Sequence, residues 1–116
     1  MNQAIIAGRL TADPIIRYTN SQLPIASFTV AVDRRKKDGD KETDFIKCTS
    51  IGSRAGFAEK WMYKGQMVCI RGSIRTGSYE KDGIKHYTTE INVEEIQPME
   101  WKTTTQEEQS TWAPNF

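Results

Sequence analysis

Alternation of apolar and polar residues with a period of two is the feature that most constrains what this chain can fold into. In "IASFTVAVD", Phe28, Val30 and Val32 fall on one face of a predicted strand. The same alternation runs through "DFIKCTSIG", "MVCIRGSIRTGSY" and "HYTTEINVEEI", which are rich in β-branched and aromatic residues. Most of the chain is therefore predicted to form β-strands with one buried face.

Turn chemistry separates these strands. The steps Asp38-Gly39 in "KKDGDKE" and Asp82-Gly83 in "EKDGIK" supply the positive φ that tight hairpin turns require. Near the start of the chain, the step Asp13-Pro14 in "TADPIIRY" interrupts the first strand pattern. The two Asp-Gly steps predict two hairpins.

One segment has helical spacing instead. In "SRAGFAEKWMYKG", Phe57, Ala58, Trp61 and Met62 recur at helical intervals, and Gly65 is predicted to end the helix. The element order is then β, β, β, α, β, β. Five strands with one short helix between the third and fourth indicate an all-β fold, the five-stranded OB-fold barrel. We expect this domain to cover residues 1–98, with a flexible tail over residues 99–116, where Thr, Gln and Glu dominate.

Chain length, net charge and cysteine content limit the possible size and cellular location of this protein. The 116 residues suffice for one small domain, which makes oligomerisation plausible, and the formal charge is only +1. The start "MNQAIIAGRL" has no signal-peptide pattern, and no apolar run is long enough to cross a membrane. Cys48 and Cys69 form no CxxC pattern and fit a reducing compartment. These observations predict a cytoplasmic protein.

Catalytic and metal-binding chemistry is not indicated. His86 is the only histidine, has no Cys or His at ligand spacing, and is interpreted as a surface residue. The chain has no GxSxG, P-loop or HExxH motif, and several of its carboxylates cluster in one turn. We therefore expect no enzyme activity, no cofactor and no metal.

Rings and cations share strand faces, which suits a ligand with flat bases and charged phosphates. Phe45 and Lys47 lie on one face of a predicted strand, and Arg71, Arg75 and Tyr79 lie on one face of another. The alternative is that both rings fill a second apolar layer and that the cations are merely solvated. Two strands with the same pairing favour a single-strand binding groove.

A run of basic residues, "DRRKKDGDKE", gives one predicted hairpin a cationic arm. This arm is a candidate for phosphate contacts or, alternatively, a solvated turn partly neutralised by its own acidic residues. Two further candidates flank the Asp-Pro turn. The complete predicted site comprises Arg9, Arg17, Arg34, Arg35, Lys36, Lys37, Phe45, Lys47, Ile51, Arg71, Arg75, Tyr79, Lys81 and Lys85.

Two longer segments resemble a known family. "AGRLTADPIIRYT" resembles the opening of bacterial-type single-stranded DNA-binding proteins, and "KGQMVCIRGSIRTGSYEKDGIKHYTTEI" resembles their fourth strand and following hairpin. The match runs in consistent order from residue 1 to about residue 97. The resemblance implies an OB-fold homotetramer, associated with the nucleoid, that wraps single-stranded DNA without sequence specificity during replication, recombination and repair.

The resemblance also implies roles for individual residues. Phe45 and Tyr79 fall where family members stack rings on bases, and Lys47, Arg75 and the basic arm fall among phosphate-contacting positions. Lys36 and Ile51 stand where the family often has further rings. The resemblance further implies that the tail recruits replication and repair proteins, although the chain ends in "TWAPNF" without the Asp-rich run that family members use for this contact.

Other functions remain open from the sequence. The chain could be an OB-fold accessory module that binds RNA or serves a primosome, or a barrel that binds only proteins. Tighter binding to single-stranded RNA than to DNA would favour the first alternative, and no binding to DNA at low salt would favour the second.

Overall fold

The structure, a computed structural model, describes residues 1–101, so residues 102–116 of the tail predicted over residues 99–116 lie outside the described residues. Its elements are β1 (Ala4–Leu10), β2 (Ile15–Tyr18), β3 (Pro24–Arg35), β4 (Lys41–Ile51), α1 (Ser53–Trp61), β5 (Met67–Lys81) and β6 (Ile84–Pro98). The sheet order is β1-β5-β6-β4-β3-β2, and a further pairing of β1 with β3 closes the ring. The predicted OB-fold barrel is confirmed.

The first barrel strand is interrupted, as the Asp-Pro step predicted. β1 and β2 both pair with β3, β1 through Arg9 and Leu10 and β2 through Ile15 to Tyr18. The six strand segments therefore make a closed barrel of five strands, because β1 and β2 occupy one position in the order. Gly8 allows the closure, since a Cβ atom there would collide with the backbone carbonyl of Ala31 on β3.

The buried faces of the strands form one core. Phe28, Val30, Cys48, Ile70 and Ile91 are among its residues. Apolar residues on these same faces become exposed where β5 and β6 extend beyond the barrel, as at Ile74 and Tyr87. A register shift opposite Arg71 and Gly72 then reverses which face of β6 is buried.

The helix is shorter than the sequence pattern suggested. α1 ends at Trp61, and Met62 is extended with its side chain buried, so Gly65 does not end the helix as predicted. Gly65 instead has a φ of 88° in the following loop, where its amide donates to the carbonyl of Leu10. Trp101 packs edge-on against Phe57 and Trp61 of α1.

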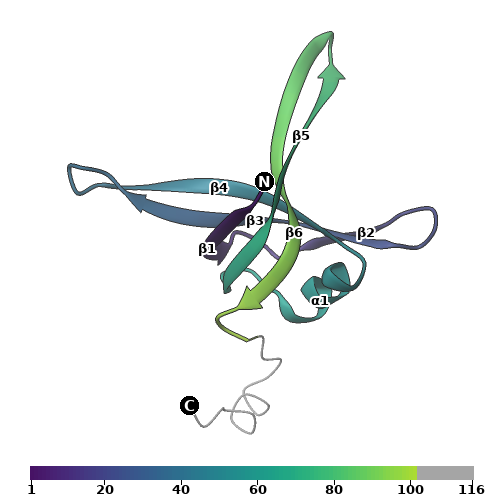
Figure 1. The fold of residues 1–116 in the computed structure, drawn as a ribbon, viewed down its shortest axis with the longest axis horizontal. Helices are drawn as coiled ribbons and strands as arrows, with labels where there is room; N and C mark the ends of the chain where they lie inside the picture. The colour runs from purple at the N-terminus through teal and green to yellow at the C-terminus, as the bar shows by residue number, and fades with distance from the viewer. Residues whose placement is uncertain (102–116) are drawn as a thin grey trace, which may run out of the picture.

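Two long hairpins extend from the barrel in different directions (Figure 1). The β5–β6 arm ends in a two-residue turn in which Asp82 and Gly83 both have positive φ, as the Asp-Gly step predicted, and the turn has type I′ geometry. In the β3–β4 arm a longer loop joins Arg35 to Lys41, and only Gly39 has positive φ there. In both hairpins the ends of the strands extend beyond the barrel (Figure 1) and are exposed.

No helix within residues 1–101 is long and apolar enough to cross a membrane.

Candidate nucleic-acid interface

The outer face of β4 carries an exposed ring beside a cation. Phe45 is 69% exposed and Lys47 is exposed, while Cys48 on the opposite face is fully buried. Ile51, at the end of the strand, keeps 42% of its surface exposed. The face assignments made from the sequence are confirmed, and Phe45 does not belong to a second apolar layer.

Strand register continues this outer face across the sheet. Thr49 of β4 pairs with Asn92 of β6, which pairs with Ser73 of β5. Because side chains alternate along a strand, Arg75 and Tyr79 lie on the same face as Ser73. The outer face of β4 therefore runs without interruption onto one face of the β5–β6 arm.

The same face extends to the other side of β4. Ile51 pairs with Ile25 of β3, which pairs with Arg17 of β2. Phe45 pairs with Ala31, so Arg35, four residues further along β3, shares its face. Among residues 1–101, the side chains of Arg17, Arg35, Lys47 and Arg75 are not engaged by a carboxylate within 4.0 Å, the limit of a salt bridge.

Register divides the basic arm into two faces. Arg34 lies on the face opposite Phe45 and forms ion pairs of 2.8 Å with Glu42 and 3.0 Å with Asp44. Lys36 joins the same cluster through a 2.7 Å contact with Glu42. Arg34 and Lys36 are thus partly neutralised within the arm, whereas Arg35 and the exposed loop residue Lys37 make no salt bridge within the described chain.

Two of the cations predicted to contact phosphate, Arg71 and Arg9, are bound by carboxylates of the protein itself. Arg71 forms 3.0 Å ion pairs with Glu94 and Glu95, where the register of β6 shifts. The pKa of Arg71 is raised, first by its hydrogen bond to Glu95 and further by the charges of Glu95 and Glu94. Arg9 is bound by Glu100 and by the backbone carbonyl of Gly65.

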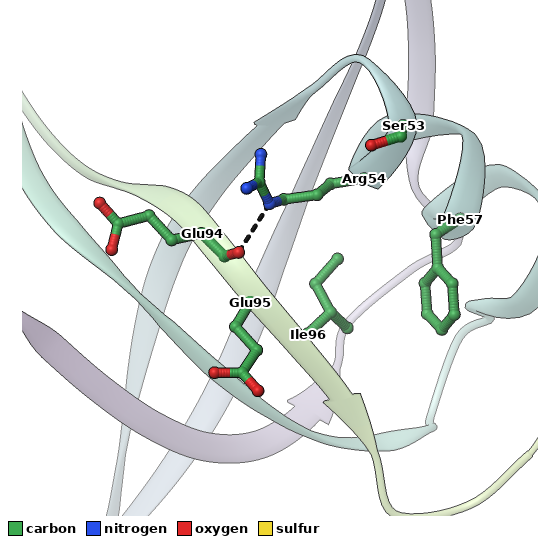
Figure 2. A pocket seen from close by; sticks show the side chains of 6 residues that line it. All are labelled: Ser53, Arg54, Phe57, Glu94, Glu95 and Ile96. Carbon is green, nitrogen blue, oxygen red and sulfur yellow. Dashed lines mark hydrogen bonds between the residues drawn. The ribbon is translucent and has the colours of Figure 1, made fainter.

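The carboxylates that hold Arg71 border a shallow depression between α1 and β6 (Figure 2). Arg54 of α1 donates to the backbone carbonyl of Glu94, and Phe57 and Ile96 form the apolar side of the depression. Two carboxylates beside Arg71 disfavour the approach of phosphate. Arg71 therefore suits an intramolecular role better than the phosphate contact predicted from the sequence.

Tyr79 stacks with His86, which was expected from the sequence to be only a surface residue. The ring of His86 stacks on Tyr79, with centroids 5.1 Å apart and planes 16° apart. The sequence could have predicted this pair, because a two-residue turn at Asp82-Gly83 places Tyr79 directly opposite His86 in the hairpin.

The reverse face of the β5–β6 arm carries its own ring. Tyr87, which is 77% exposed, pairs with Ser78, and Lys85 lies over its ring at 5.5 Å. Lys85 is therefore separated from Tyr79 and Arg75 by the thickness of the sheet.

No cluster of three or more His, Cys, Asp and Glu side chains that could hold a metal ion occurs in the described part of the chain. Burial and, to a smaller extent, the charge of Glu90 raise the pKa of the Cys48 thiol to about 12, so this sulfur stays protonated at neutral pH. Cys48 is a core residue with no available thiolate.

Comparison with known proteins decides the family. The model of the single-strand binding protein family matches residues 1–99. This chain belongs to that family.

Relatives within the single-strand binding protein family are substantially similar in sequence. Single-stranded DNA-binding protein 3 of Clostridium acetobutylicum is 45% identical over 104 residues, which cover 87% of this chain and 72% of the relative. Single-stranded DNA-binding protein 1 of Streptococcus pyogenes serotype M18 is 41% identical over 108 residues, covering 90% and 83%. A Plasmodium falciparum SSB, solved in complex with ssDNA, has the same fold, with a TM-score of 0.82 over 86% of this chain and 96% of the other at 20% identity.

In this member of the single-strand binding protein family, one sheet face brings together most of the predicted site residues. Arg17, Arg35, Phe45, Lys47, Ile51, Arg75, Tyr79 and Lys81 lie on it by register. Lys37 lies in the arm loop beside it. The other five predicted residues do not contribute a free cation to this face. Arg9, Arg34, Lys36 and Arg71 form ion pairs with carboxylates, and Lys85 lies on the reverse face of the β5–β6 arm.

Proposed function

We propose that this protein binds single-stranded DNA without sequence specificity along the outer face defined by Phe45, Lys47, Arg75 and Tyr79. The supporting observation is that two exposed rings and several unpaired cations share one continuous sheet face. OB-folds bind oligonucleotides on their second and third barrel strands and on two loops, which here are β3, β4, the β2–β3 connection and the β5–β6 arm. Family membership and the names of the relatives support the same ligand.

In this proposal, the rings bind the bases by stacking and the cations bind the phosphates. Every base has a π-face, so Phe45 and Tyr79 accept any base, while Arg75, Lys47 and Arg35 neutralise phosphates. Ile51 offers an apolar contact to a base edge or sugar where a ring is absent. Because the contacts are made to base faces and phosphates, the binding needs no particular sequence.

The test is a fluorescence-anisotropy titration of the full chain against single-stranded DNA, duplex DNA of equal length and single-stranded RNA. We expect the single-stranded DNA to bind most tightly, with similar affinity for different base sequences. Preference for the RNA would favour the RNA accessory module instead. No binding to any strand at low salt would favour a barrel that binds only proteins.

We also propose that the protein assembles as a homotetramer. The stretch of β1 from Ala4 to Gly8 pairs only with β5, which leaves its other edge open for a second copy, and Ile5 on this strand is 65% exposed. Light scattering at micromolar concentration should give about 53 kDa, four times the 13.2 kDa of the chain. A mass near that of one chain would contradict this assembly.

The cellular role follows from the ligand. We infer that the protein protects single strands exposed during replication, recombination and repair, acts in the cytoplasm at the nucleoid, and catalyses no reaction on the DNA. The predicted recruitment of replication and repair proteins through the tail falls on residues outside the described chain. Incubation with a labelled strand, which we expect to leave it uncut and unmodified, tests the absence of catalysis.

A further inference from the structure

The ring stack on the β5–β6 arm places a third ring, that of His86, beside the two rings of the proposed site. Tyr79 is 52% exposed and His86 is also exposed, so the pair lies on the surface and not in the core. Their planes are nearly parallel, at 16°, with centroids 5.1 Å apart. Each ring therefore has a second flat side that is directed away from its partner.

The surroundings of the stack favour an anionic, flat ligand. Beside Tyr79 and His86 on this face lie the pair Gly77 and Thr88 on one side and the pair Lys81 and Ile84 on the other. Gly77 has no side chain that could cover Tyr79. The arm is thus uncrowded on the side that leads toward Arg75 and the barrel.

The charges around His86 are mixed, but its own face is cationic near the ring. Lys81 of β5 lies on this face next to the stack, and the only acidic residue of the same face on either strand of the arm is Glu90, which pairs with Arg75. Glu80 and Lys85 face each other on the reverse side, and Asp82 lies in the turn. Glu90 is separated from His86 by Thr88.

We propose that His86 is a binding residue for single-stranded DNA, which stacks with Tyr79 against the bases and whose protonation strengthens the contact with the phosphates. The inference rests on the proposed function. The imidazole ring is flat in both protonation states, so its stacking is retained at neutral pH. In the protonated state both ring nitrogens donate, and the added positive charge attracts the strand.

The test is a titration with oligo(dT) at about pH 5.5 and about pH 7.5, a range in which histidine side chains change charge and the bases of the strand do not. We expect the wild type to bind roughly two- to fivefold more tightly at the lower pH, the effect of one exposed ion pair. His86→Phe keeps a flat ring that cannot be protonated, so its affinity should no longer depend on pH. His86→Ala should also lose affinity at the higher pH, by about fivefold or more.

Tyr87→Ala removes a ring from the reverse face of the same arm and is the matched control, expected to retain both affinity and pH dependence. Thermal unfolding of each variant establishes that the barrel is intact. Wild-type affinity in His86→Ala, with Tyr79→Ala weakened, would show that His86 only packs against Tyr79 and would overturn the inference. Failure of the wild type to bind oligo(dT) at all would instead reject the proposed function.

A second readout uses the fact that His86 is the only histidine. Its imidazole proton signals can be followed by NMR against pH, with and without oligo(dT). Since the strand is anionic, we expect bound DNA to shift the titration midpoint to higher pH. An unchanged or lower midpoint would overturn the phosphate contact.

Discussion

At the scale of single residues, exposure distinguishes the rings proposed to bind DNA from the rings that pack in the core. Phe45 and Tyr79 are 69% and 52% exposed on the outer face, whereas Phe28 is 5% exposed in the core. An exposed ring contributes little to folding, because its apolar surface stays in contact with water. Phe45 and Tyr79 are therefore positioned to bury that surface against a ligand.

Phe45→Ala and Tyr79→Ala should each weaken binding to oligo(dT) by about 1–3 kcal/mol, the contribution of stacking one base. The loss should persist at high salt, since stacking releases no counterions. Anisotropy titrations at two salt concentrations measure it, and melting temperatures should change little. A large drop in melting temperature with unchanged affinity of the folded protein would identify these rings as ordinary packing.

At the scale of elements, the β3–β4 arm shows what the sequence could and could not predict. Alternation identified the strands and the faces of Phe45 and Lys47, and the Asp-Gly steps identified both hairpins, because these are local properties. The ion pairs of Arg34 and Lys36 depend on which residues of β4 lie opposite, and those of Arg71 and Arg9 on residues at least 23 positions away. A local pattern can suggest that the acidic residues of the arm partly neutralise it, but it cannot identify which cations are paired and which are free.

The two faces of the arm should differ in their effect on salt dependence. For single strands, log K falls with log salt by about 0.7 per neutralised phosphate. The double variant Arg35→Gln with Lys37→Gln should flatten the slope by about 1.4, because both side chains are unpaired. The control, Arg34→Gln with Lys36→Gln, removes the same charge from the ion-paired face and should flatten it less. A larger effect of the control would reverse the assignment of the two faces.

At the scale of the whole molecule, barrel closure aligns the strands that carry the site. β1 meets β3 only at Arg9 and Leu10, and this contact needs the close approach at Gly8. The β4–β6 pairing, which continues the outer face onto the β5–β6 arm, is also short. Substitutions far from the outer face can therefore weaken the proposed DNA binding by disrupting the strand pairing of the barrel.

Gly8→Ala should lower stability by about 1–3 kcal/mol, since its Cβ atom would force β1 and β3 apart. The matched control is Gly56→Ala in α1, where a Cβ atom meets nothing within 4 Å, and a helical alanine should stabilise the protein by about 0.5–1 kcal/mol. Denaturant unfolding of both variants measures the difference. Equal stability of the two variants would mean that the barrel closes without this close contact.

Photo-cross-linking can show whether single-stranded DNA lies on the outer face and stacks on its rings. The full chain is irradiated with an oligo(dT) strand that carries 5-iodouracil, which reacts with nearby aromatic side chains, and the linked peptides are identified by mass spectrometry. We expect cross-links at Phe45 and Tyr79 of the outer face and none at Tyr87 of the reverse face or Trp61 of α1. Cross-links confined to Tyr87 or Trp61 would contradict it.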